Sequence, residues 1–166
     1  MTVAREVWVR AAAPTDAPAI REVAISAWWA TYAGRIADET IERFLATAYS
    51  EERIRVRIER HEVLLAAPGE AAAADAFAEV AVHADHLQLV SIYTRPEARG
   101  RGLGSALIGA IVAAHPDDDL AADVLLDNEL AEPFYAARGF VPGELLIDEI
   151  AGDPVQERRW WRRAAR

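Results

Sequence analysis

Apolar residues recur every three or four positions in the first third of the chain, which is the spacing of a helix that buries one face. One such stripe begins near Asp16 and ends at Gly34, a second begins at Asp38, and a third follows Ser50, a residue type that favours helix starts. The positions expected to face the core in the first two helices are Ile20, Val23, Ala24, Ala27, Trp28, Ile41, Phe44, Leu45 and Ala48.

Short apolar runs bounded by turn residues predict strands in the rest of the chain. The expected strands cover residues 5–10, 62–67, 76–83, 87–94, 122–126, 141–150 and 155–161. Further helices are expected after residue 103 and over residues 134–138, where Gly139 ends the helix. A proline is tolerated in a first turn, so Pro133 favours a start nearer Ala131, with Asn128 in the loop before it; the alternative is that Asn128 is the helix N-cap. Short turns make the second, third and fourth strands an antiparallel meander, whereas a helical crossover makes the fourth and fifth parallel. The pattern predicts one α/β domain over residues 1–166.

The stretch from residue 87 to 114 joins an apolar strand to an amphipathic helix through a glycine cluster. Helix N-termini carry free N–H groups and the positive end of the helix dipole, so a bare backbone turn there suits a phosphate. A Walker loop is excluded because it needs a lysine, and the chain contains none. A dinucleotide fingerprint is disfavoured because, starting at Gly102, its third small residue would fall on Leu107.

The chain of 166 residues has a formal net charge of −9 and contains no cysteine. The absence of cysteine excludes disulfides, thiolate metal sites and a cysteine nucleophile. The acidic balance argues against nucleic-acid binding, which needs a basic surface. No segment approaches the roughly 20 apolar residues of a membrane span, and residues 1–10 lack the apolar core of a signal peptide. We therefore expect a soluble cytoplasmic protein without a membrane or nucleic-acid partner.

Two motifs stand at a characteristic distance from each other. The run Arg99-Gly100-Arg101-Gly102-Leu103-Gly104, after a strand that ends at residues 92–94, resembles the acyl-CoA loop of GNAT-type N-acetyltransferases. Downstream, the family's next motif is matched by Asn128, Ala131, Phe134, Tyr135, Gly139 and Phe140. The resemblance covers nearly the whole chain. It implies the GNAT fold: a mixed central sheet of about seven strands, helices on both faces, and a splay between the two central strands.

The resemblance also implies a mechanism, in which an amine attacks the thioester of acetyl-CoA directly, with no metal and no covalent enzyme intermediate. Acetyl-CoA would lie in the splay and bond the strand backbone, while the glycine loop binds its pyrophosphate. Tyr135 stands where family members place the acid that protonates the leaving thiolate, and a phenol with a pKa of about 10 stays protonated at neutral pH. The residues assigned to acetyl-CoA in this way are Ile92, Tyr93, Thr94, Arg99, Gly100, Arg101, Gly102, Leu103, Gly104, Ser105, Asn128 and Tyr135.

The general base has two candidates on one predicted strand, Glu79 and His83, whose spacing puts both on the same face. His83 titrates in the useful pH range, whereas Glu79 would need its pKa raised by burial. A solvated strand face explains both residues as well, so the base stays open. For the acceptor pocket, Trp29 and Tyr32 fall off the buried stripe of their helix and are better candidates than Trp28.

We expect an N-acetyltransferase that acts on a primary amine of a small molecule or protein, and the sequence leaves that acceptor unidentified. The alternative is a non-catalytic acyl-CoA-binding module that senses the ligand or holds a partner. The tail from residue 158 to 163 mixes arginines with tryptophans, but in so acidic a chain a final strand with protruding arginines explains it without nucleic acid. That strand is also suited to pairing across a homodimer interface.

Overall fold

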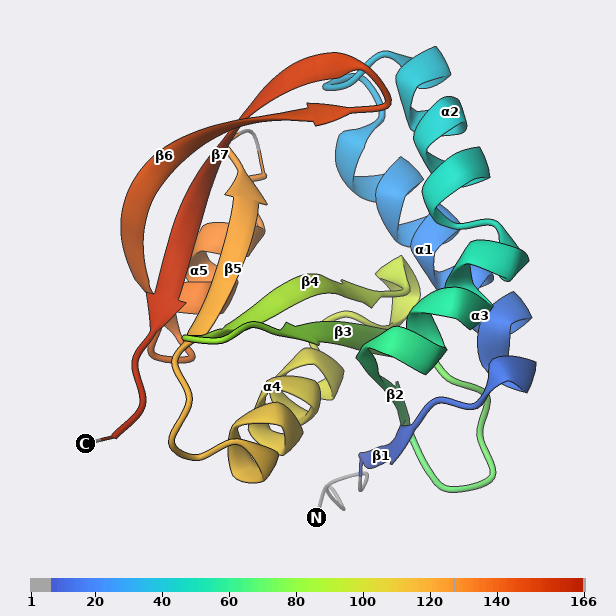
Figure 1. The fold of residues 1–166 in the computed structure, drawn as a ribbon. Helices are drawn as coiled ribbons and strands as arrows, with labels where there is room; N and C mark the ends of the chain where they lie inside the picture. Colours follow the sequence, from blue (N-terminus) through green and yellow to red (C-terminus); the bar gives the residue numbers. More distant parts are fainter. Residues whose placement is uncertain (1–6, 127, 166) are drawn as a thin grey trace.

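The structure is a computed structural model that describes residues 7–126 and 128–165. Seven strands form one sheet in the order β1-β2-β3-β4-β5-β7-β6 (Figure 1). Their bounds are β1 Trp8–Ala11, β2 Glu62–Ala67, β3 Ala76–Val82, β4 Leu87–Thr94, β5 Leu120–Leu125, β6 Val141–Ile150 and β7 Asp153–Arg162. Neighbours β4 and β5 run parallel, and the other neighbouring pairs are antiparallel. The predicted mixed sheet is confirmed, although the first two residues of the strand expected at 5–10 lie outside the described residues.

The helices cover both faces of the sheet, as predicted. Their bounds are α1 Ala17–Tyr32, α2 Asp38–Ala48, α3 Glu51–Arg60, α4 Leu103–Ala114 and α5 Ala131–Ala136. One hydrophobic cluster joins α1, α2 and α3 to β2 and β3, and a second joins α4 and α5 to β4, β5 and β7. Figure 1 shows the first three helices grouped beyond the end of β4 and α4 beneath β3 and β4. None of the described helices combines the length and the apolar character that crossing a membrane requires.

Local sequence explains where the early helices begin. Ser50 caps α3 as expected, because its Oγ accepts a hydrogen bond from the Arg53 N–H at 3.3 Å. Asp16 differs: a short 3₁₀ turn precedes α1, and the Asp16 carboxylate bonds back to the Ala13 N–H and to Arg10, each at 2.8 Å. The predicted inward positions of α1 and α2 are buried, apart from Phe44 and Ala48, which are half-buried.

The sheet opens between its two central strands. β4 and β5 are paired only from Leu87 to Leu89, which lie opposite Leu120 to Ala122, and both strands continue beyond this point without pairing to each other. β4 also carries a bulge at Val90, which has no partner in the register of β3 and β4 and so turns the strand away at this point. Figure 1 shows the far ends of β4 and β5 pointing apart, which confirms the predicted splay.

Candidate active site

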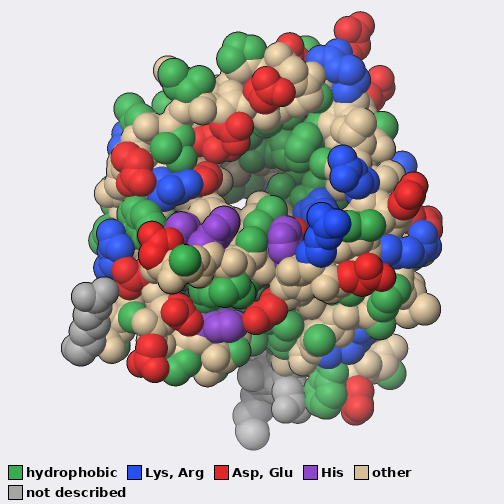
Figure 2. Space-filling model, viewed as in Figure 1, with side chains coloured by type: hydrophobic (Ala, Val, Ile, Leu, Met, Phe, Trp, Pro, Cys, Tyr) green, Lys and Arg blue, Asp and Glu red, His purple; other side chains and the backbone are tan. Residues whose placement is uncertain are grey.

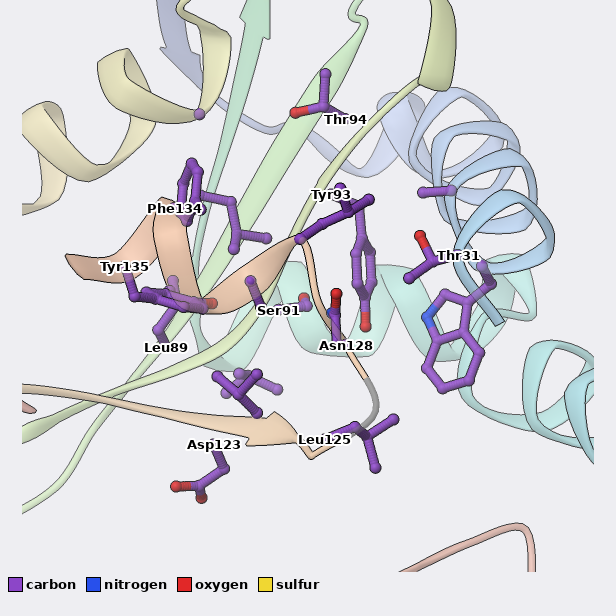
Figure 3. Close-up of a pocket in the computed structure, with 18 of the residues that line it drawn as sticks. Thr31, Leu89, Ser91, Tyr93, Thr94, Asp123, Leu125, Asn128, Phe134 and Tyr135 are labelled. Carbon is purple, nitrogen blue, oxygen red and sulfur yellow. The ribbon is translucent and has the colours of Figure 1, made fainter. Parts of the chain in front are cut away.

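A cavity of about 770 Å³ opens where β4 and β5 diverge (Figure 3). Its walls come from β4, the turn before α4, α5, the ends of β5, β6 and β7, and the facing sides of α1 and α2. Residues assigned to acetyl-CoA that line it are Ile92, Tyr93, Thr94, Arg99, Gly100, Gly102, Leu103, Gly104, Ser105, Asn128 and Tyr135. Arg101 is exposed and lies outside this lining. The fold thus brings most residues of both motifs to one cavity.

The glycine loop forms the N-terminus of α4 at one end of the cavity. Gly100 and Gly102 have φ angles of 76° and 84°, a region that L side chains rarely adopt. A Cβ on either residue would meet nothing within 4 Å, so the bare backbone borders open space. The first helical bond runs from the Ala106 N–H to the Gly102 carbonyl, which leaves the N–H groups before Ala106 available at the helix end.

Close packing ties the second motif to the first. A Cβ on Gly104 would lie 2.7 Å from the Phe134 ring, so α5 approaches α4 this closely only because position 104 has no side chain. The Arg138 guanidinium stacks 3.7 Å from the centre of the Phe134 ring and donates a hydrogen bond of 2.5 Å to Ser105 Oγ. Sequence reasoning missed Arg138, which lies in the variable part of the motif, directly before Gly139.

Tyr135 lies on α5 with its ring in an aromatic cluster and its side chain at the cavity. Its ring packs edge-on against Phe134 and Phe140, with centroids 5.2 and 5.1 Å away, and only 7% of the residue is exposed. No hydrogen-bond partner for its hydroxyl is found among residues 7–126 and 128–165. Burial raises the pKa of this hydroxyl above its ordinary value, so Tyr135 stays protonated at neutral pH.

Asn128 lies in the loop between β5 and α5, as expected from a helix that begins at Ala131 with Pro133 in its first turn. Its side-chain N–H donates to the Tyr32 hydroxyl at 3.1 Å. Its Oδ1 atom is buried and has no partner among the described residues. Burial raises the pKa of Tyr32 to about 12, so both groups remain neutral hydrogen-bonding groups at the cavity wall.

The aromatic lining corrects one sequence prediction. Trp28, Thr31 and Tyr32 line the cavity, whereas Trp29 is half-buried and packs into the helical cluster instead. Residues 28, 31 and 32 lie on one face of α1, and a single further residue turns the side chain about 100° around the helix. Tyr32 therefore lines the cavity and Trp29 does not. Trp28 and Tyr32 are both buried and belong to the core as well as to the cavity, so Tyr32 does not fall off the buried stripe as expected. A role of these residues in an acceptor pocket stays a prediction.

Glu79 and His83 lie in different surroundings, and neither is among the residues that line the cavity. Glu79 is 2% exposed, and its carboxylate accepts hydrogen bonds from Arg57 at 2.8 and 3.0 Å and contacts His61 Nδ1 at 2.5 Å. Burial alone would raise the pKa of Glu79, but the hydrogen bonds and charge of Arg57 outweigh it and lower that pKa. His83 follows the end of β3, is exposed, and stacks on His86 at 4.9 Å.

This buried pair gives a testable stability prediction. Replacing Glu79 by Ala leaves the partly buried Arg57 charge without its partner, so the free energy of unfolding should fall by about 3–5 kcal/mol. Because the folded pKa of Glu79 is lowered, its stabilisation is present above the unfolded value of about 4.3 and is lost as the pH falls through the folded value. Urea unfolding followed by tryptophan fluorescence measures both effects.

The matched control is the exposed pair on the same helix, Glu51 and Arg55, whose side chains are 44% and 46% exposed. Glu51→Ala should change the free energy of unfolding by about 0.5 kcal/mol or less. Equal losses in the Glu51 and Glu79 variants would show that the buried pair contributes no more than a surface pair.

The opposite end of the cavity is acidic. Asp123 of β5, Asp148 and Glu149 of β6, and Glu157 of β7 all line it. Figure 2 shows acidic side chains bordering the hollow on the side of β6 and β7. Asp123 accepts hydrogen bonds from Arg159 at 2.7 and 2.8 Å, so this arginine of β7 is paired within the sheet. Sequence reasoning did not single out these acids, because β5, β6 and β7 meet only in the fold.

Comparisons with known proteins agree with this geometry. The sequence profile of the acetyltransferase (GNAT) domain matches residues 59–142, from the end of α3 to the start of β6. A search among curated proteins returned no match. The PaiA N-acetyltransferase of Thermoplasma acidophilum, solved in complex with coenzyme A, is 23% identical with a TM-score of 0.75, over 92% of this chain and 98% of that chain.

Two other solved structures are similar over nearly their whole length. A GCN5-related N-acetyltransferase from Rhodopseudomonas palustris is 21% identical with a TM-score of 0.79, over 99% of each chain. The ribosomal-protein-S18-alanine N-acetyltransferase of Escherichia coli is 18% identical with a TM-score of 0.68, over 97% of each chain. These likenesses show the fold, and the profile spans half of the sequence, including both motifs. The chain belongs to the GNAT family of acetyltransferases.

Proposed function

We propose that this protein transfers the acetyl group of acetyl-CoA to a primary amine by direct attack of the amine on the thioester. The observation that carries the proposal is the continuity of one cavity. It joins the glycine-bordered N-terminus of α4, the gap between β4 and β5, and the unpartnered hydroxyl of Tyr135. An anion site, a slot for an extended chain and a proton donor therefore stand in the order in which acetyl-CoA would meet them.

The α4 end of the cavity fits the pyrophosphate of CoA. The free N–H groups of the first helical turn and the helix dipole attract phosphate oxygens, and the bare positions 100 and 102 let them approach. The Arg99 guanidinium lies at the same end and donates to Thr31 Oγ1 at 2.9 Å. Arg138, held over the Phe134 ring, adds a second positive charge beside Ser105.

The gap fits the amide-bearing arm of CoA. Beyond Leu89, β4 is paired on one side with β3 and is unpaired towards β5, so its backbone groups on that side are available to an extended ligand. Backbone N–H groups near Ile92 would stabilise the negative charge that develops on the thioester oxygen. Asn128 Oδ1 offers a buried acceptor without a partner, which suits an amide N–H of the same arm.

Tyr135 fits the proton donor for the departing thiolate. Its hydroxyl is held neutral by burial, and none of the described residues competes for its hydrogen bond. A group that only binds CoA has no need of a buried, unpartnered donor beside the gap, since leaving such a group unpaired costs free energy. This favours the transferase over a module that senses acyl-CoA.

The test has two stages. Isothermal titration should first show that CoA binds to the purified protein, and failure to bind would remove the basis of the proposal. Release of free thiol from acetyl-CoA should then be measured with aliphatic mono- and diamines, aminoglycosides, amino-acid amides, and peptides with free α-amino or lysine amines. Turnover with any of these confirms the proposal. CoA binding without turnover across the whole panel would favour the binding module.

A further inference from the structure

We propose that Glu157 is the group that receives the acceptor: its carboxylate binds the ammonium form of the amine and then removes one proton from it. This inference rests on the proposed acetyl transfer. It adds the residue that acts as the general base and the protonation state in which the amine binds. In neutral water a primary aliphatic amine is mostly protonated, and it must lose a proton before its nitrogen can attack a carbonyl carbon.

The position of Glu157 in the sheet is the first support. β7 pairs with β5 so that Glu157 lies opposite Leu125, three residues beyond Ala122, the last β5 residue paired with β4. The matching distance along β4 leads from Leu89 to Ile92. Glu157 therefore lies one strand away from the open part of the gap, at the level where the thioester is expected, and it lines the same cavity as Tyr135.

The lack of a partner is the second support. Arg159, two residues along β7 and on the same face, gives its guanidinium to Asp123 at 2.7 and 2.8 Å. Glu157 itself is half-buried, and its carboxylate makes no ion pair or hydrogen bond within residues 7–126 and 128–165. Burying an ionised carboxylate without a partner costs free energy, and binding of a cation such as an ammonium group would offset that cost. Tyr135 lines the same cavity, and its hydroxyl has no hydrogen-bond partner among the described residues. This second unsatisfied group independently indicates that the cavity binds a ligand.

The electrostatic surroundings suit a base at neutral pH. Burial, together with the like charges of Asp148 on β6 and Asp123 on β5, raises the pKa of Glu157 to about 7, while Arg159 opposes the rise. Across the cavity, burial and the charge of Glu157 both raise the pKa of Tyr32 of α1, so its hydroxyl is neutral. Glu79 differs, because Arg57 holds its carboxylate ionised and away from the cavity lining.

The protons and bonds balance without a further reactant. The ammonium gives one proton to the Glu157 carboxylate, and the neutral nitrogen attacks the carbonyl carbon. As the new C–N bond forms and the C–S bond breaks, Tyr135 gives its proton to the leaving sulfur. The Tyr135 phenolate then takes the second proton from the nitrogen, and the product is the neutral amide. Glu157 returns its proton to water.

The experiment compares pH profiles of kcat/KM between pH 5 and 9, with benzylamine and 1,4-diaminobutane as amine probes. The wild type should lose activity as the pH falls through about 7, because protonated Glu157 cannot accept a proton. Glu157→Gln should lower kcat/KM at pH 7.5 by about 100-fold, abolish this limb, and leave the affinity for CoA within about twofold. Asp148→Asn removes a like charge, so it should move the limb to lower pH while activity persists.

A second readout needs no turnover. Carbon-13 NMR of glutamate-labelled protein should show one carboxyl that titrates near pH 7, is absent from Glu157→Gln, and shifts to lower pH when 1,4-diaminobutane is added. Titration of Glu157 near the ordinary value of about 4.3, or an unchanged pH profile in Glu157→Gln, would overturn the inference. A diamine-dependent shift without turnover would retain the ammonium site and reject acetyl transfer, so the two proposals fail separately.

Discussion

Replacing Tyr135 by Phe should lower kcat for acetyl transfer by about 100-fold or more, while the dissociation constant for CoA stays within about twofold. The variant removes only the hydroxyl proposed as the proton donor and keeps the ring that lines the cavity, so the loss should fall on the chemical step. The Tyr135 hydroxyl has no hydrogen-bond partner among the described residues, and its ring contacts with Phe134 and Phe140 are kept. The free energy of unfolding should therefore change by about 0.5 kcal/mol or less. Steady-state kinetics with a responsive amine and titration with CoA measure the two parts.

Tyr49→Phe is the matched control, because it removes a phenolic oxygen from the same cavity on the side away from α5. Tyr49 is 2% exposed, and its hydroxyl accepts a hydrogen bond from Arg57 Nη2 at 3.5 Å. Turnover of this variant should remain within about threefold of the wild type. If Tyr135→Phe kept wild-type turnover, the proton of the leaving thiol would come from another donor, and the role proposed for Tyr135 would be wrong.

Local sequence patterns were sufficient to predict most of the fold. The period of apolar residues predicted α1, α2 and α3, and glycines and prolines marked the turns between the strands, because these features depend on residues close in sequence. The splay between β4 and β5 followed from the resemblance to a family. The bulge at Val90 accompanies it, and nothing in the residues around position 90 distinguishes a bulge from a continuous strand.

The charged part of the site depended on contacts that the sequence does not display. Arg57 belongs to a run of alternating charges that reads as a solvated helix face, yet it reaches across to Glu79, 22 residues later. On β7, Glu157 and Arg159 look like equal members of a charged strand. Only the pairing of β7 with β5 places Asp123 beside Arg159, where the two form an ion pair, and leaves the Glu157 carboxylate without a partner among the described residues. The base was therefore sought on β3, whereas the unpaired carboxylate lies on β7.

The glycine loop gives the second large effect. Gly102→Val should raise the dissociation constant for CoA by at least about 100-fold, which corresponds to about 2.7 kcal/mol of binding free energy. At a φ of 84°, a β-branched residue is strained by roughly 1–2 kcal/mol and favours a different turn, which misplaces the N–H groups at the start of α4. Any side chain that keeps the turn projects into the open space where the pyrophosphate is expected to approach. Isothermal titration with CoA measures the loss.

Gly109→Val makes the same substitution on the same helix and serves as the control. Gly109 is exposed in α4, and a Cβ there would meet nothing within 4 Å. Because valine is at least as good a helix former as glycine, this variant should keep its stability, and its affinity for CoA should stay within about twofold. Equal affinities in the two variants would mean that CoA does not bind at the N-terminus of α4. The assignment of the cavity to acetyl-CoA would then fail, because its anion-binding end would have no ligand.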